Sequence, residues 1–134
     1  MCIASCVRMS DSKIVYTFTR DERVDRPFLD PHWIQTDVFA PIDSEAGGTW
    51  IGFNPSYILS IQNGGEQAHV RQLPYEKSRG VLLLDLLKTN NWEGFISSLN
   101  HNRIEPFTLN KIDIANQTLK VYTFNGSTVN EKNV

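Results

Sequence analysis

The sequence has no excess of basic residues and no long hydrophobic run, and these absences exclude several classes of protein. Among its 134 residues, 13 are Lys or Arg and 15 are Asp or Glu, which gives a net charge of −2. Proteins that bind DNA or RNA through phosphates need clustered Lys and Arg, so no nucleic-acid partner is predicted. The purest apolar run is Val81–Leu84, which Asp85 interrupts. A membrane-spanning helix needs about 20 apolar residues, so no membrane span is expected.

Cysteine and histidine are also scarce, which argues against a disulfide framework and against a metal site. Cys2 and Cys6 lie in a predicted strand, where a spacing of four residues separates their Cα atoms by about 13 Å, whereas a disulfide needs less than about 7 Å. The histidines, His32, His69 and His101, are scattered, and there is no C-x-x-C pair, so no metal site is predicted. Without a signal-peptide pattern at the N-terminus, we expect a cytoplasmic protein, with mitochondrial association as an option if the source is eukaryotic.

Short β-branched segments and two helical patterns are what the sequence does contain. Alternation over residues 2–7 and a β-branched, aromatic run over 13–19 predict a hairpin. Further strands are expected at 49–53, 57–61, 107–114 and 119–124. Between them, Ser78 and Asn91 are typical caps for two helices, the first through 81–88 and the second with an apolar stripe at Trp92, Phe95, Ile96 and Leu99. This order predicts an α+β fold with mostly antiparallel pairs.

Three polar stretches are expected to lack regular structure. The first is a Pro- and Asp-rich stretch that runs through Pro27, Pro31 and Pro41, and the second spans residues 66–77. The third is the end of the chain. The predicted organisation is therefore one domain over residues 1–126, followed by a polar, disordered tail over residues 127–134.

Two segments have the residue types that chemistry needs. Removal of Met1 would leave Cys2 with a thiol and a free α-amine on one carbon, and the amine titrates near pH 8, so it can act as a base for the thiol. The alternative for Cys2 is a small side chain in an edge strand. Gly47–Gly52 has glycines five residues apart but no Gly-Lys-Ser/Thr, so it is no phosphate loop and predicts a tight turn into a strand.

A series of motifs extends along the chain in a fixed order. They are Met1-Cys2-Ile3, Thr19-Arg20-Asp21-Glu22 at the end of the second predicted strand, Arg26-Pro27, the Gly-Gly-Thr-Trp-Ile-Gly of Gly47–Gly52, Asn63, Arg79-Gly80, and the Phe-x-Leu-x-x-x-Asp of Phe107, Leu109 and Asp113. This series resembles the NRDE family, which includes the animal transport and Golgi organisation proteins. The resemblance covers residues 1 to about 126 and the front part of the family pattern, and Thr19 replaces the Asn of the name motif.

The resemblance implies the architecture of an N-terminal-nucleophile (Ntn) hydrolase, in which antiparallel sheets are stacked between helices in an αββα order. Six predicted strands and two helices make only a short or incomplete version of it. An apolar sheet face and a sheet edge would then be exposed, and a homodimer is one way to cover them.

The function that this resemblance favours is the binding and trafficking of haem or of an amphipathic metabolite such as a lipid or an acyl-CoA. No resident cofactor is assigned, and haem is a candidate ligand. The turns that begin at Arg20 and Gly47 would shape a pocket, and Arg20 or Arg79 would meet an acidic group by a bidentate contact. The implied ligand-binding residues are Arg20, Glu22, Gly47, Gly48, Thr49, Trp50 and Arg79.

The alternative that the same resemblance implies is a cysteine amidohydrolase that cleaves the C–N bond of a small acylated compound. Cys2 would be the nucleophile, Arg20 would lie beside the thiolate, Asp21 would orient the α-amine, and Asn63 would contact the oxyanion or the substrate. Neighbours in a strand point to opposite faces, so Arg20 and Asp21 can both serve the site only if the strand has ended. In a third interpretation the motif residues mainly hold the fold, with Trp50 in the core between the sheets.

Overall fold

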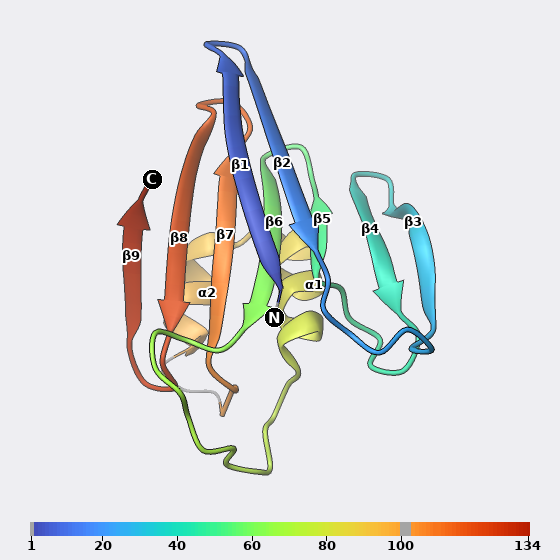
Figure 1. Ribbon diagram of the computed structural model, residues 1–134, viewed down its shortest axis with the longest axis vertical. Helices are drawn as coiled ribbons and strands as arrows, with labels where there is room; N and C mark the ends of the chain where they lie inside the picture. The colour runs from blue at the N-terminus through green and yellow to red at the C-terminus, as the bar shows by residue number, and fades with distance from the viewer. Residues whose placement is uncertain (1, 100–102) are drawn as a thin grey trace.

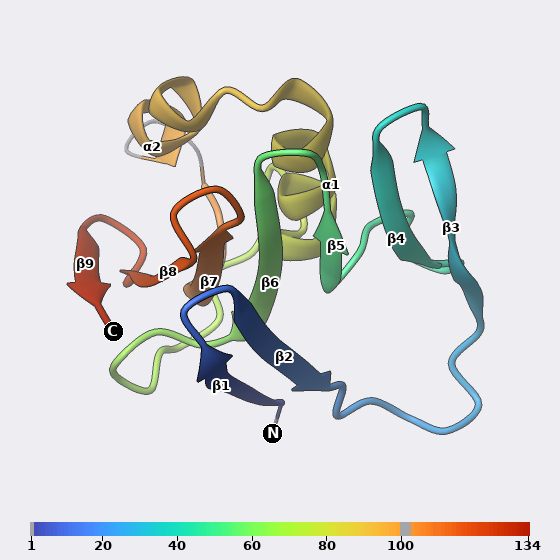
Figure 2. The same cartoon turned by 90° about the horizontal axis from the view of Figure 1, so that it is seen from above.

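The computed structural model describes residues 2–99 and 103–134, and it has an α+β fold built on antiparallel sheets, as the sequence predicts. A seven-stranded sheet has the order β3-β4-β5-β6-β7-β8-β9, and a separate two-stranded sheet contains β1 and β2. Figures 1 and 2 show both helices on one face of the large sheet and the β1–β2 hairpin on the other. The strands are β1 (Ile3–Ser10), β2 (Lys13–Thr19), β3 (Phe28–Gln35), β4 (Val38–Asp43), β5 (Ile51–Phe53), β6 (Tyr57–Asn63), β7 (Phe107–Asp113), β8 (Thr118–Phe124) and β9 (Val129–Asn133), and the helices are α1 (Arg79–Thr89) and α2 (Trp92–Leu99).

The β1–β2 hairpin confirms the first prediction and has one exposed apolar face. Its ladder runs from the pair Ile3–Thr19 to the pair Ser10–Lys13. Alternate residues point toward the large sheet and are half-buried, while Ile3, Val7 and Met9 on the outer face are 51–61% exposed. An exposed apolar sheet face was expected from the small number of predicted strands, and this hairpin provides it.

The prediction of a Pro- and Asp-rich loop is right only as far as Pro27. Residues 20–27 have no helix or strand, but the stretch that contains Pro31 and Pro41 forms the β3–β4 hairpin, so the prediction was wrong there. Pro has no N–H to donate to a ladder, so it is confined to sheet edges and bulges. Pro31 lies in the edge strand, within a register shift between Leu29 and His32. Pro41 lies opposite that shift, and on its other side β4 pairs with β5 only at Phe39. Neither proline therefore removes a ladder hydrogen bond.

The end of the chain is also ordered, so the predicted tail over residues 127–134 was wrong. Strand β9 pairs with β8 from Phe124–Val129 to Lys120–Asn133. Its residues after Val129 are polar and exposed, as suits the edge strand of a sheet. Backbone pairing, rather than an apolar face, places this strand, so hydrophobic periodicity could not reveal it.

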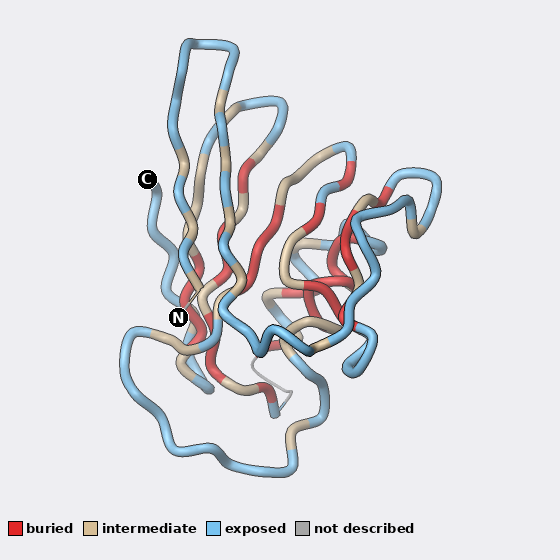
Figure 3. The backbone as a smooth tube through the Cα atoms, turned by 45° about the vertical axis from the view of Figure 1, so that its right-hand side comes forward, coloured by how far each residue is buried: buried red, intermediate tan, exposed pale blue. Residues whose placement is uncertain are grey.

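The apolar core lies between the helices and the large sheet, where Figure 3 shows the longest buried stretches. Both predicted caps are present: Ser78 Oγ accepts the N–H of Val81 at 3.2 Å, and Asn91 Oδ1 accepts the N–H of Gly94 at 2.9 Å. The fully buried apolar side chains include Leu59, Leu83, Leu87, Leu99, Phe107, Leu109 and Phe124. Within the described residues, neither helix has the length and apolar character needed to cross a membrane.

Candidate functional site

A cleft of about 510 Å³ is lined by residues near the ends of β2 and β6 and near the beginnings of β5 and α1. Residues far apart in sequence meet there because these four element ends share one edge of the fold. All the predicted site residues except Gly47 line the cleft: Cys2, Arg20, Asp21, Glu22, Gly48, Thr49, Trp50, Asn63 and Arg79. The structure therefore brings together the residues that the motifs singled out, which is where a ligand site is expected.

Cys2 lies just before β1, on the wall of the cleft. Its Sγ accepts the backbone N–H of Asp21 at 3.5 Å, and its carbonyl oxygen accepts Nε2 of Gln62 at 3.0 Å. Strand β2 ends at Thr19, so Arg20 and Asp21 are not bound by strand alternation and both line the cleft. Both side chains can serve the site, as the sequence analysis required, because the strand has ended before them.

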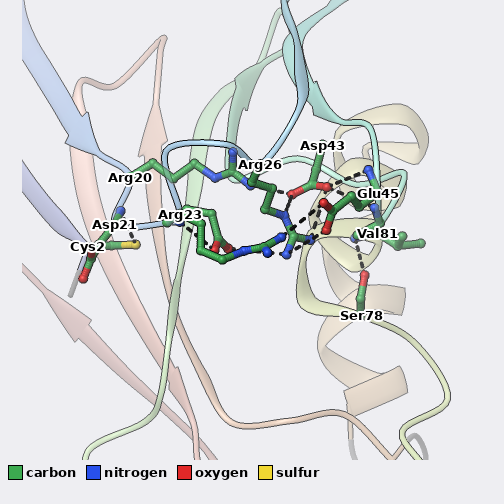
Figure 4. A network of polar contacts seen from close by, with 11 residues as sticks. Cys2, Arg20, Asp21, Arg23, Arg26, Asp43, Glu45, Ser78 and Val81 are labelled. Atoms are coloured by element: carbon green, nitrogen blue, oxygen red, sulfur yellow. Dashed lines mark hydrogen bonds and ion pairs between the residues drawn. The ribbon is translucent and has the colours of Figure 1, made fainter.

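Arg20 extends toward Asp43 rather than toward the Cys2 thiol, as Figure 4 shows. Its guanidinium forms an ion pair with the Asp43 carboxylate and lies over the ring of Trp50, 3.9 Å from the centroid. A guanidinium on an aromatic face is held by the ring quadrupole. The contacts of Arg20 in this structure are thus Asp43 and Trp50, whereas the family resemblance implied a place beside the thiolate.

Asp43 is a site residue that the sequence analysis missed. Its carboxylate also accepts Nε and Nη2 of Arg26, at 2.7 and 3.2 Å, and the backbone N–H groups of Glu45 and Ala46, both at 3.0 Å. Burial raises the pKa of Asp43, but the hydrogen bonds from Arg26 and the two backbone N–H groups outweigh it, so the net pKa is lowered. An Asp before Ser-Glu-Ala-Gly-Gly does signal a turn, but nothing in that signal identifies the two arginines.

Arg79 begins α1 and faces the cleft with 18% of its side chain exposed. Its Nη2 lies 3.0 Å from Oε2 of Glu105, and its Nη1 donates to the carbonyl of Pro106 at 3.0 Å. Burial lowers the pKa of Arg79, while Glu105 and, more weakly, Cys2 favour the charged form. Arg79 is therefore a cation that is largely withdrawn from water and is paired with the Glu105 carboxylate.

Gly48 and Gly80 let the chain before β5 touch the first turn of α1. A Cβ at Gly48 would lie 2.3 Å from the backbone carbon of Gly80, and the N–H of Thr49 donates to the Gly80 carbonyl at 3.0 Å. Gly47 has a φ of +70°, which suits glycine at a sharp turn. Gly47, Gly48 and Gly80 thus hold the wall of the cleft together, which agrees with the interpretation that part of the motif series is structural.

Trp50 does not fill the core between the sheets, and that expectation was wrong. The residue is half-buried on the wall of the cleft, with Arg20 on its face and the edge of Phe28 at 5.7 Å between centroids. Strand β5 is only three residues long, so Trp50 precedes it and its ring can turn toward the cleft. The part of the ring that Arg20 and Phe28 leave uncovered borders the cleft.

His32 and His69 do not line this cleft. His32 is exposed on β3, and His69 lines a second cavity, of about 500 Å³, with Nε2 3.2 Å from Oε1 of Glu105. His101 lies outside the described residues. Over residues 2–99 and 103–134 no three His, Cys, Asp or Glu side chains are grouped so that they could hold a metal ion.

A model of a known protein family matches almost the whole chain. The family model described as Transport and Golgi organisation 2 matches residues 1–133. The match extends over the cleft residues from Cys2 to Arg79 and over both sheets, and it agrees with the resemblance seen in the motifs. No curated protein matches the chain significantly.

Proposed function

The chain belongs to the Transport and Golgi organisation 2 family, and from this premise we propose that its cleft binds an amphipathic metabolite with an acidic group, for transfer rather than for conversion. Haem and long-chain acyl-CoA are the candidate ligands. The observation that carries the proposal is the lining of the cleft, which combines two largely shielded arginines, Arg20 and Arg79, with the half-buried Trp50 and the exposed Leu73. A volume of about 510 Å³ lies within the usual range for small-molecule and cofactor sites.

The acidic end of the ligand is assigned to Arg79. Its guanidinium is largely shielded from water, so a carboxylate or phosphate that reaches it forms a charge-assisted hydrogen bond in a medium of low polarity. Arg71, on the loop before α1, is 67% exposed and lies 4.0 Å from the same Glu105 carboxylate. This weakly paired arginine at the mouth is free to turn toward a second acidic group.

The apolar part of the ligand is assigned to Trp50 and Leu73, which also line the cleft. Trp50 presents its ring beside Arg20, and Leu73 is 64% exposed on the loop that borders the cleft. Burying such surface against a hydrocarbon or porphyrin is favourable by about 25 cal/mol per Å². An exposed leucine on a cleft loop is thus a contact that a ligand can use.

The charge balance of the cleft supports an amphipathic ligand rather than a simple anion. The lining contains as many acidic as basic side chains: Arg20, Arg26, Arg71, Lys77 and Arg79 against Asp21, Glu22, Asp43, Glu76 and Glu105. No net positive field attracts phosphate or citrate over a distance. Affinity must then come from apolar contact together with one or two local ion pairs.

The test is titration of the purified protein with haemin and with palmitoyl-CoA, followed by calorimetry and by tryptophan fluorescence. We expect the double variant Arg20→Ala, Arg79→Ala to bind at least about tenfold more weakly, which corresponds to about 1.4 kcal/mol. Arg23→Ala is the matched control, because Arg23 lies on the same turn, is 60% exposed and pairs with Glu45 outside the cleft. Unchanged affinity in the folded double variant would refute the proposal, and circular dichroism confirms that the variant is folded.

A second function, amide hydrolysis by Cys2, is favoured by one contact. The Cys2 Sγ lies 3.5 Å from the Asp21 N–H, inside the cleft that Asn63 also lines. The Cys2 thiol would attack an amide carbonyl, with its proton passing to the departing nitrogen, to give a thioester and release an amine. Water would then hydrolyse the thioester, releasing the acid and restoring the thiol. Cys2→Ala separates the two functions: it abolishes turnover of acylated amines if Cys2 is a nucleophile, and it leaves ligand affinity within about twofold if the cleft only binds.

A further inference from the structure

Cys2 is held in place although it lies beyond the end of its strand. The β1–β2 ladder stops at the pair Ile3–Thr19, so no ladder hydrogen bond fixes the backbone of Cys2. A residue at such a position frays unless other contacts hold it. In this structure the side chain of Gln62, on β6 of the other sheet, donates to the Cys2 carbonyl at 3.0 Å.

The side chain of Gln62 is itself fixed by a polar chain between the two sheets. Its Oε1 accepts Nδ2 of Asn110 at 3.2 Å, which leaves Nε2 to face Cys2. The same Asn110 nitrogen donates to Oγ of Ser60 at 3.3 Å, and Ser60 Oγ is hydrogen-bonded to the hydroxyl of Tyr16 on the hairpin. Asn110 and Ser60 are buried. The Gln62 amide accepts through its oxygen on one side and donates through its nitrogen on the other, so it has one orientation. In that orientation Nε2 donates to the Cys2 carbonyl.

We propose that Gln62 is a positioning residue of the cleft: through its bond to the Cys2 carbonyl, with Asn110 fixing the amide orientation, it keeps the Cys2 thiol on the cleft wall at the N–H of Asp21. The proposal rests on the proposed function only in taking this cleft as the site. It holds whether the cleft binds or hydrolyses, because Cys2 forms part of the cleft wall in either case.

The hairpin has other contacts with the large sheet, so Gln62 is not needed simply to dock it. Tyr16 bonds to Ser60 in the middle of the interface, and Arg8 donates to the carbonyl of Gln117 at its far end. Both contacts lie away from the cleft. Removal of the Gln62 donor should therefore release Cys2 and leave β1 and β2 in place.

The experiment compares Gln62→Glu with Gln35→Glu, both in a Cys6→Ala background so that Cys2 is the only thiol. Glu at position 62 keeps the size of the side chain and still accepts from Asn110, but it has no proton to donate to the Cys2 carbonyl at pH 7. Gln35 lies at the exposed end of β3 and makes the same charge change far from the cleft. The probe is iodoacetamide, with the rate of Cys2 alkylation read by mass spectrometry.

We expect Gln62→Glu to speed Cys2 alkylation about fivefold, the population change that loss of one neutral hydrogen bond of about 1 kcal/mol gives, because alkylation proceeds from the released state. In a ¹⁵N spectrum the Asp21 amide proton should shift upfield as it loses the sulfur. Gln35→Glu should change neither quantity. Ser60→Ala, which breaks the Tyr16 contact but leaves the Gln62 donor, should keep the rate within about twofold.

Three outcomes overturn the proposal. The alkylation rate and the Asp21 amide are unchanged in Gln62→Glu; or Gln35→Glu gives the same change; or hydrogen exchange of the β1–β2 amides rises across the whole hairpin in Gln62→Glu, which would make Gln62 a docking residue. None of these measurements uses a ligand. Failure of the proposed function, read from the arginine variants, is therefore distinguishable from failure of this inference.

Discussion

The two faces of the seven-stranded sheet are covered by different means. On the helix side, side chains such as Leu83, Leu87 and Phe107 are fully buried in one apolar cluster. On the hairpin side, the contacts between the layers include the polar chain through Tyr16 and Ser60, and the hairpin's own outer face is exposed. Apolar burial is strong but without direction, whereas hydrogen bonds fix position and contribute little net free energy. We therefore infer that the helix side stabilises the fold and the hairpin side positions the cleft.

The largest effect should come from the helix side. Phe107→Ala removes a fully buried ring that contacts Phe124, and we expect it to lower the free energy of unfolding by about 3–5 kcal/mol. Phe53→Ala is the control, since Phe53 is 37% exposed on the other face and should lose much less. Urea denaturation measures both, and similar losses for the two variants would break the comparison.

An intermediate effect is expected where β4 ends at the cleft. Asp43→Asn removes the charge that pairs with Arg20 and Arg26, and we expect a loss of about 2–3 kcal/mol at pH 7. Because the pKa of Asp43 is lowered in the fold, the stabilisation that its charge gives the fold is complete above the pKa of an unfolded Asp, about 3.9. It is lost as the pH falls through the lower folded value.

The measurement is urea denaturation between pH 3 and pH 7. The variant should lose less stability with acid than the wild-type protein does. Asp37→Asn, at an exposed turn between β3 and β4, is the matched control and should follow the wild-type profile. An Asp43→Asn profile parallel to that of wild type would contradict the assigned role of the Asp43 charge.

The smallest effect should come from the hairpin side. Tyr16→Phe removes a hydroxyl whose partner Ser60 keeps a second bond from Asn110, so we expect a loss of about 0.5–1.5 kcal/mol. Burial raises the pKa of Tyr16 although its hydrogen bonds oppose the shift. The stabilisation that the neutral hydroxyl gives the fold is therefore present below about pH 10 and is lost as the pH rises through the pKa of the folded state.

Urea denaturation from pH 8 to pH 11 measures both expectations for Tyr16→Phe. The variant should show a weaker loss of stability above pH 10. Part of the loss of stability above pH 10 should remain in the variant, because Tyr122 also ionises more readily in the unfolded chain. Burial and Glu131 raise the pKa of Tyr122 in the fold to about 12. A loss near 4 kcal/mol at pH 8 would show that the polar side contributes as much stability as the apolar side.

Elements that bury apolar side chains periodically were predictable, and elements held by pairing were not. The β1–β2 hairpin, both helices with their caps, and β6 to β8 follow from alternation, an apolar stripe or a capping residue. The β3–β4 hairpin contains Pro31 and Pro41, which signal a loop unless the bulge that accommodates them is known. Strand β9 has almost no apolar residues, and only its partner β8 gives it a conformation.

The candidate site shows the same division. The family resemblance, which rests on the order of the motifs, was enough to predict that Cys2, Trp50 and Arg79 belong to one site. It could not show that Arg20 pairs with Asp43, or that Gln62 holds Cys2, because both contacts cross between elements that are distant in sequence. A lone Asp or Gln in a strand has no local signature for such a role.

The most direct test of the central claim, that the cleft is the ligand site, is a ¹⁵N amide spectrum recorded during titration with palmitoyl-CoA and with zinc protoporphyrin, a diamagnetic haem analogue. We predict that the saturable shifts cluster at Cys2, Asp21, Trp50, Asn63 and Gly80, which line the cleft. Shifts centred on the exposed Trp33 and Phe53, or no saturable shift with either ligand, would contradict it.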